Sequence, residues 1–365
     1  MGRVSEYLFD VDHVSYTVCP VSGVSEICQA VENCGDEVKC VIFINCGATF
    51  NLVHKLSPPQ DLHFYVLDSH RPVDLDNVMD DQQVHVLVKE GEQTEMNCPR
   101  PDDIYRFDSS SDEEESDDNS DPDSDEDSVA PAGKRRKKNW EDRAEKAERL
   151  RNWTERRKEL LFQYYELSYM SHASVTLLFN LAFQFSRVTP ELLWWTLVGY
   201  TSQYLEGRIN LEEYTSAAIT DLRKYVKHMD HLQKVDSNRN ITDRVRICAE
   251  NELNLPLYRH WCLYESFTHG MIPFSRLQLW TQSGTRRKSQ FFVDIGVPLN
   301  DSKQRYNAME TEMRNELIGS VEKKMEKHKL TDIVFASFTA QFAYKKKISA
   351  SDAVCGLMAL IEFGV

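Results

Sequence analysis

The strongest constraint on the fold of this chain is an acidic run, residues 109–127, that cannot take part in a packed core. The run contains eleven carboxylates and no basic residue, and it accounts for most of the formal net charge of −15. Without apolar side chains nothing offsets the entropy lost when such a backbone is ordered, so we predict that residues 99–133 are disordered. The rest of the chain is nearly balanced in charge and has ample apolar material for folded cores.

Two sequence signals accompany the acidic run. Five serines have a carboxylate three residues downstream, the spacing that acidophilic kinases prefer, and these phosphorylation candidates are Ser109, Ser110, Ser111, Ser120 and Ser124. A compact basic pentad follows and is typical of nuclear import signals: Lys134, Arg135, Arg136, Lys137 and Lys138. Two other interpretations of the pentad are a charge balance for the acidic run and the start of the next helix. We predict localisation in the nucleus.

What the sequence lacks disfavours several classes of protein. No apolar run approaches the roughly 20 residues of a membrane span, and no signal-peptide core follows Met1. Nine cysteines are scattered without a Cys-x-x-Cys pair, which favours reduced, mostly buried thiols over a disulfide framework or a zinc site. Because no Gly-x-x-x-x-Gly-Lys-Ser/Thr loop is present to hold phosphates, we expect no ATP hydrolysis.

The first part of the chain alternates between strand and helix patterns. We predict strands at 13–18, 38–44, 62–67 and 84–88 and an amphipathic helix at 24–33. The nearly continuous apolar run at 38–44 is typical of a strand covered on both faces. Strands separated by short connections indicate a mostly parallel sheet, whose ligands lie off the carboxyl ends of the strands. The loops that begin at Asn45 and Asp68 are therefore where we expect a site.

The middle of the chain is rich in helix signals. Asn139 can cap a helix that runs to about residue 169, polar in its first half and apolar in its second. Further helices are predicted at 173–186, 190–205, 210–231, 243–253, 257–267, 274–282 and 304–328. Thr189 can cap the second of these, and Asn210 with Glu213 has capping-box spacing. Trp194 and Trp195 fall within an apolar helix, which favours a core or interface role over base stacking.

The pattern changes again at the end of the chain. At 334–344 apolar residues alternate with Ser337, Thr339 and Gln341, which predicts a strand with one polar face. Ser351 or Asp352 can then cap an apolar helix. Because that helix still continues at residue 365, we expect the chain to be a fragment or a shortened isoform.

Two loops carry a resemblance to a known family. Asn45-Cys-Gly47 after one strand and Asp68-Ser-His-Arg-Pro72 after the next would lie together at one sheet edge, as in two-metal phosphoesterases. The sequence here resembles the DHH phosphoesterase superfamily, which includes RecJ-type nucleases. It is more similar still to a eukaryotic branch, the cell division control protein 45 family of replicative-helicase subunits. The matching stretches are 12–23, 44–48, 68–73, the acidic insertion, 193–199, 258–263 and 350–354.

The metal-binding positions of the superfamily are largely replaced in this sequence. The aspartate-rich first motif is missing, Asn45 stands where the second motif has an Asp, and Ser202 falls near the expected Asp of the fourth. Asp68 and His70 remain from the third motif, but Arg71 adds a positive charge where a second His would bind. One carboxylate and one imidazole cannot hold two hard divalent cations. We therefore predict no metal, no cofactor and no catalytic residue, and we interpret these five residues as a vestigial motif.

The resemblance implies an α/β fold with a mostly parallel DHH-type sheet, flanking helices, a disordered acidic insertion and a helix-rich insertion. Residues 1–98 would form the first part of the DHH-like domain, 99–138 the disordered insertion and 139–207 the helices that complete the domain. Residues 208–330 would form the helical insertion, and 331–365 a strand and helix that lead back toward the α/β body. Because the family is longer at both ends, we expect its first strand and its second α/β domain to be absent.

The resemblance also implies a role as a non-catalytic subunit of the replicative helicase in the initiation and elongation of DNA replication. The implied partners are the minichromosome-maintenance hexamer and the GINS complex, then the replicative polymerase, checkpoint or loading factors and single-stranded DNA. Arg286, Arg287 and Lys288 are candidate DNA-backbone contacts, and a solvated loop is the alternative. Two other classes stay open: a residual metal-dependent DHH phosphoesterase or nuclease, and an acidic module that binds basic proteins.

Overall fold

The computed structural model describes residues 2–11, 13–35, 37–89, 92, 96–105, 132–235, 245–342 and 346–363. The chain forms two compact units. Gly23–Ser171 is called here the parallel unit, and Met1–Ser22 with His172–Val365 the antiparallel unit, after the sheet that each contains. The serines of the acidic run lie outside the described residues. The domain boundaries derived from the resemblance stay a prediction.

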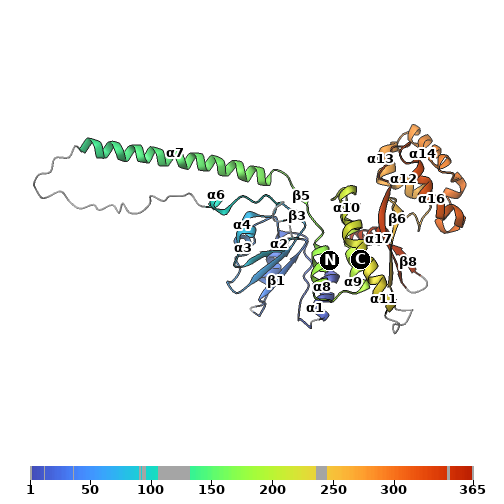
Figure 1. Ribbon diagram of the computed structural model, residues 1–365, viewed down its shortest axis with the longest axis horizontal. Helices are drawn as coiled ribbons and strands as arrows, with labels where there is room; N and C mark the ends of the chain where they lie inside the picture. Colours follow the sequence, from blue (N-terminus) through green and yellow to red (C-terminus); the bar gives the residue numbers. More distant parts are fainter. Residues whose placement is uncertain are drawn as a thin grey trace, which may run out of the picture. The chain divides into compact units, whose positions relative to one another are not determined.

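The parallel unit is built on a small sheet of order β1-β2-β4 in which every pairing is parallel (Figure 1). Its elements are α2 (Val24–Glu32), β1 (Cys40–Ile44), α3 (Leu52–Leu56), β2 (His63–Leu67), β3 (His70–Arg71), α4 (Leu75–Met79), β4 (Val84–Val86), α6 (Pro101–Tyr105), α7 (Ala132–Tyr165) and β5 (Tyr169–Met170). The predicted helix at 24–33 and the strands at 38–44, 62–67 and 84–88 are confirmed, although β1 and β4 are shorter than expected.

The expectation that the apolar run at 38–44 is covered on both faces is wrong. Phe43 is buried together with Phe64 of β2 and Val84 of β4, whereas Ile42, on the opposite face of the pleat, is 37% exposed. Successive side chains of a strand point to opposite faces, so the sheet buries one face and leaves the other partly open. The predicted strand at 13–18 is also wrong. Residue 13 lies in a turn, residues 14–18 belong to no strand in the described part of the chain, and the side chains of all six are exposed.

Helix α7 begins at residue 132, so the basic pentad lies in the first turns of the helix and Asn139 is not its cap. Lys and Arg are good helix formers, which explains why the helix extends through the pentad. The C-terminal end of α7, where the sequence becomes apolar, contacts the loop before α4. The Tyr164 hydroxyl donates to the carbonyl oxygen of Val73 at 2.8 Å, and the Leu75 amide donates to the Tyr165 hydroxyl at 3.1 Å.

The antiparallel unit combines a three-stranded sheet of order β6-β7-β8 with helices. Its elements are α1 (Gly2–Val11), α8 (Ser174–Gln184), α9 (Pro190–Leu205), α10 (Leu211–Ala217), the π-helical turn η1 (Ala218–Leu222), α11 (Arg223–Val235), β6 (Val245–Leu253), α12 (Leu263–His269), α13 (Met271–Leu277), α14 (Gln282–Asp294), α15 (Leu299–Ser302), the 3-10 turn η3 (Tyr306–Ala308), α16 (Thr311–Lys324), β7 (Val334–Phe342), β8 (Lys346–Ser349) and α17 (Ala350–Phe363). Together with the antiparallel pair β3-β5 of the other unit, this makes the described part of the chain a mixed α/β fold in which one sheet is parallel and the others are antiparallel.

Several helix predictions in this unit are confirmed. Helix α9 occupies 190–205, and its cap is Thr189, whose hydroxyl accepts from the Leu192 amide at 3.2 Å. Asn210 and Glu213 form the predicted capping box at the start of α10. Trp194 is 7% exposed, as expected for a core residue. All nine cysteines are free thiols, but the expectation that they are mostly buried is wrong, because Cys19 and Cys40 are exposed and the other seven are partly exposed.

Other predictions here are wrong. Residues 245–253 form strand β6 and not a helix, because every residue from Val245 to Leu253 pairs with β7. The strand predicted at 334–344 is by contrast confirmed as β7, and most of its polar face is buried: Ser337 is 1% and Thr339 3% exposed, whereas Gln341 is exposed. Helix α17 is capped by the hydroxyl of Ser349, which accepts from the Asp352 amide at 3.1 Å. The helices predicted at 257–267, 274–282 and 304–328 are replaced by the shorter α12, α13 and α16.

A hydrophobic core of the antiparallel unit lies around α12, α14 and α16. Its fully buried members include Tyr258, Phe267, Phe291 and Phe292, all 1% exposed or less, and the last three rings contact one another. Such aromatic clusters bury large apolar areas and fix the relative positions of short helices. Among the helices in the described ranges, none combines the length and the hydropathy that crossing a bilayer would require.

Candidate functional site

The loops after β1 and β2 meet at the carboxyl edge of the parallel sheet, as the sequence predicts. Ile44 and Leu67 are register partners, and the Asn45 amide extends the pairing by donating to the Leu67 carbonyl at 2.8 Å. The Ser69 hydroxyl donates to Oδ1 of Asn45 at 3.0 Å. The Asn45 side chain therefore holds the neighbouring loop in place.

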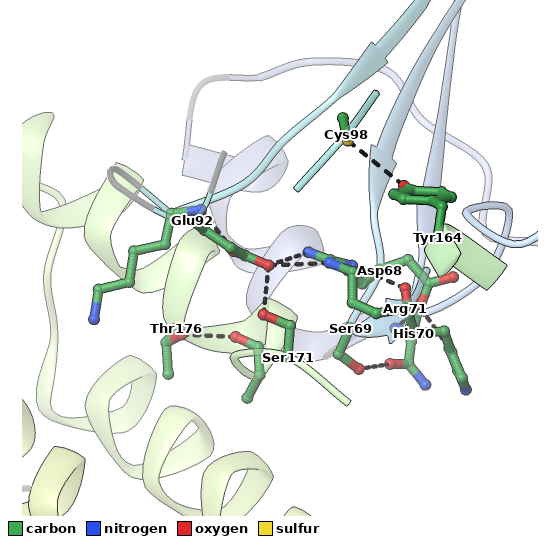
Figure 2. Close-up of polar contacts among 12 residues, drawn as sticks. Asp68, Ser69, His70, Arg71, Glu92, Cys98, Tyr164, Ser171 and Thr176 are labelled. Carbon is green, nitrogen blue, oxygen red and sulfur yellow. Dashed lines mark hydrogen bonds and ion pairs between the residues drawn. The ribbon is translucent and has the colours of Figure 1, made fainter. Parts of the chain in front are cut away.

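Asp68 is 3% exposed, and both of its carboxylate oxygens accept hydrogen bonds from amides in the loops after β1 and β2. Oδ2 accepts from the Ala48 amide at 3.2 Å, and Oδ1 accepts from the His70 amide at 3.1 Å. Oδ1 also lies 2.6 Å from Nδ1 of His70 (Figure 2). Burial, and after it the negative charge of Asp68, raises the pKa of the Cys46 thiol in the adjoining loop. The thiol beside Asp68 therefore stays protonated at neutral pH.

Arg71 is 2% exposed, and all three nitrogens of its guanidinium donate to acceptors within the parallel unit. Nη1 donates to the carbonyl oxygens of Asp68 at 2.8 Å and His70 at 2.9 Å. Nε and Nη2 both donate to Oε1 of Glu92, at 3.0 and 2.5 Å (Figure 2). Because these bonds occupy all three nitrogens, Arg71 fastens the loop to Glu92 and does not present its charge to an incoming phosphate.

Glu92 completes this cluster and is 6% exposed. Its Oε1 also accepts from the Ser171 hydroxyl, and its Oε2 accepts from the Lys89 amide at 3.1 Å. Burial raises the pKa of Glu92, but the hydrogen bond from Ser171 and the charge of Arg71 outweigh it, so that the net shift is downward. Glu92 is therefore ionised at neutral pH and forms a buried ion pair with Arg71.

Glu92 and Ser171 are the members of the cluster that sequence reasoning missed. Strand β5 pairs with β3 in antiparallel register, and the Ser171 amide donates to the Ser69 carbonyl at 2.8 Å, which brings Ser171 to Glu92. Glu92 and Ser171 lie 79 residues apart in the chain, and no sequence motif links them. The one available signal was Arg71 itself, since an arginine in a loop that becomes buried requires a carboxylate partner.

The structure brings together Asn45, Asp68, His70 and Arg71, but Ser202 belongs to α9 of the antiparallel unit, where its hydroxyl donates to the Gly199 carbonyl at 2.8 Å. Within the described ranges, no three His, Cys, Asp or Glu side chains are grouped so that they could hold a metal ion. Hard divalent cations require several free oxygen ligands. The carboxylate oxygens at this edge already accept from internal N–H and O–H groups, so this donor set does not fit such a cation.

The candidate DNA-contacting residues lie on helix α14 and not in a loop. Lys288 is 4% exposed: its Nζ donates to Oγ1 of Thr268 at 2.8 Å and lies 3.7 Å from the centre of the Tyr264 ring. A DNA contact at this position stays a prediction that rests on Arg286 and Arg287, because Lys288 faces the protein interior.

The site is thus the carboxyl edge of a parallel sheet in an α/β protein, with an Asp-Ser-His-Arg loop whose side chains are bonded to neighbouring groups of the same unit. The chain belongs to the CDC45 family, whose model matches residues 3–133 and 106–365.

Similar proteins agree with this membership. Cell division control protein 45 homolog of Mus musculus is 34% identical over 365 residues, which cover 99% of this chain and 62% of the relative. The homolog of Schizosaccharomyces pombe is 30% identical over 97% of this chain and 59% of the relative. The crystal structure of CDC45 from Entamoeba histolytica matches with a TM-score of 0.64 at 19% identity, over 97% of this chain and 56% of that chain. The chain thus spans roughly three fifths of these relatives.

Proposed function

We propose that this protein is a non-catalytic, nuclear subunit of the eukaryotic replicative helicase, which joins the minichromosome-maintenance hexamer and the GINS complex during DNA replication. Membership of the CDC45 family supports this proposal. Contacts to the replicative polymerase, to checkpoint and loading factors and to single-stranded DNA belong to the same proposal.

The non-catalytic part of this proposal rests on one observation: the carboxylates in the loops after the strands already accept internal hydrogen bonds. Asp68 and Glu92 accept from backbone amides, Ser171 and Arg71, so each oxygen of both carboxylates already has an internal donor that a bridging metal ion would have to displace or share. Two-metal catalysis needs such bridging ligands to activate water and to stabilise the leaving group. The locked edge instead provides a rigid body, and rigid bodies lose little conformational freedom when they bind partners. The free energy with which the chain binds the other subunits would influence the helicase motor, although the chain itself does not drive that motor.

Reconstitution tests this function. The full chain would be mixed with the recombinant hexamer and GINS, and complexes would be separated by size-exclusion chromatography. We expect the chain to elute with both, and a variant lacking residues 109–127 to do the same, because the folded surfaces carry the contacts. Elution of the intact chain apart from both partners would contradict the proposal. Loss of the complex only in the deletion variant would favour the acidic binding module.

A metal titration separates this function from a residual nuclease. Calorimetry with Mn²⁺ should give no saturable heat for the wild-type chain, and the Asp68→Ala variant should behave in the same way. Micromolar binding that disappears in Asp68→Ala, together with hydrolysis of a phosphodiester substrate, would replace the scaffold role by a metal-dependent phosphoesterase.

A further inference from the structure

Helix α13 and the turn that leads into α14 present three large apolar side chains to solvent. Met271 is 83%, Phe274 44% and Trp280 63% exposed, and the rings of Phe274 and Trp280 are in contact, with centroids 5.3 Å apart. Met271 and Phe274 are three residues apart and therefore share a face of the helix. The adjacent face of α13 is anchored by Pro273 and Leu277, which are buried. These three exposed residues are called here the Trp280 surface.

The turn that carries Trp280 is rigidly built. Gln278 adopts a left-handed conformation with φ of 53° and ends α13, and Oγ1 of Thr281 accepts from the Gly284 amide at 2.9 Å to cap α14. A Cβ atom on Gly284 would lie 2.1 Å from the Gln278 carbonyl oxygen, so the turn and the helix are in direct backbone contact. An aromatic pair on such a turn is already ordered and loses little entropy when it is covered.

The rim of the Trp280 surface is positively charged. Between residues 271 and 293 the sequence has four basic residues and no acidic one. Arg286 is exposed, and Nη2 of Arg287 lies 3.3 Å from both Oε1 of Gln278 and Oγ of Ser283 at the edge of the turn. Arg276 forms a long ion pair with Asp332 at 3.7 Å, both of them substantially exposed. A ligand that approaches the aromatic pair therefore meets arginine side chains.

Two classes of ligand fit arginine beside exposed aromatics, and the charges favour one of them. A nucleic-acid strand is held mainly by several phosphate contacts, and here the interior position of Lys288 leaves few cations to make them. Trp, Phe, Met and Arg together are the residues enriched where proteins bind one another. We propose that the Trp280 surface and Arg287 bind a segment of a partner protein that combines carboxylates with an apolar or aromatic anchor. This inference goes beyond the helicase role and does not depend on it.

Peptide selection on the full chain tests the proposal. Short random peptides displayed on phage would be selected on the wild-type protein after depletion on the double variant Trp280→Ala/Arg287→Glu. Enriched sequences should be acidic and contain Leu, Ile, Phe or Trp. Enrichment without a bias toward acidic residues, or no enrichment over the depleted pool, would overturn it.

Fluorescence anisotropy of the most enriched peptide then locates the contact. Trp280→Ala should weaken binding by about tenfold or more, as for a truncated aromatic anchor. The matched control is Phe363→Ala, since Phe363 is 82% exposed in the same unit but on α17, and it should bind like wild type. Equal losses in both variants, with unchanged thermal melts, would contradict a specific surface. A thymidine oligonucleotide that binds more tightly than the peptide and displaces it would assign the surface to nucleic acid and refute the protein ligand.

Discussion

Replacing Arg71 by Met tests whether the buried ion pair holds the carboxyl edge of the parallel sheet. The Met side chain fills the position of the apolar stem but removes two hydrogen bonds to Glu92 and two to the carbonyls of Asp68 and His70. Breaking a buried pair by removing one partner costs about 3–5 kcal/mol. Since Glu92 keeps its donors from Ser171 and the Lys89 amide, we expect a loss of about 3 kcal/mol, the lower end of that range.

Hydrogen exchange of the amides in β2 measures this loss within the parallel unit alone. A loss of about 3 kcal/mol should make exchange from the opened state about 100-fold faster. The matched control is Lys39→Met, which removes an exposed ion pair with Asp61 at 3.4 Å beside the same sheet. Exposed pairs contribute little, so the control should change exchange by no more than about twofold to fivefold.

Acidification and a double variant test whether the lost stability comes from the ion pair between Arg71 and Glu92. Folding lowers the pKa of Glu92, so the pair contributes fully above the ordinary value of 4.5, and this stability is lost as the pH falls through the folded-state pKa. In Arg71→Met the carboxylate is buried without its cation, and the deficit should shrink in acid. Adding Glu92→Leu should restore most of the stability. Wild-type exchange rates in Arg71→Met, or a double variant no more stable than Arg71→Met alone, would refute the stabilising role of the ion pair.

Four further outcomes are expected. Replacing the basic pentad by alanines should abolish nuclear accumulation of a fluorescent fusion protein, and unchanged accumulation would argue against an import signal. Lys288→Ala should destabilise the antiparallel unit by about 2 kcal/mol in urea, whereas Arg286→Ala should change stability by less than about 0.5 kcal/mol. Ser349→Ala should cost about 1 kcal/mol through loss of the α17 cap, read from the thermal melt. Iodoacetamide at mildly alkaline pH should modify exposed Cys19 well before Cys46, whose thiol pKa is raised.

Local signals predicted the elements that a short window of sequence defines. Helix α9 begins where Thr189 supplies the cap and Pro190 the first turn, and α10 begins with its capping box. The meeting of the Asn45 and Asp68 loops also followed, because strands of a parallel sheet share one carboxyl edge. In each case the information lies within a few residues or in a rule of topology.

Elements whose state depends on a distant partner were the ones misjudged. Residues 245–253 carry polar and apolar side chains that suit a helix, yet β7, more than eighty residues later, supplies a full ladder of hydrogen bonds. Residues 13–18 have the alternation of a strand but no strand pairs with them in the described part of the chain. Pairing between strands, and not alternation alone, decides which segment becomes part of a sheet.

By itself, the sequence determined that an acidic run interrupts the folded chain, that a parallel sheet precedes it and that Asp68 and His70 lack a full set of metal-ligand neighbours. Only the tertiary structure decided what those residues do instead. It buried Arg71 against Glu92 and Ser171, and it turned Lys288 toward Tyr264 and Thr268. The physical reason is that the role of a charge depends on its exposure and its partner, and both are set by contacts between residues far apart in the chain.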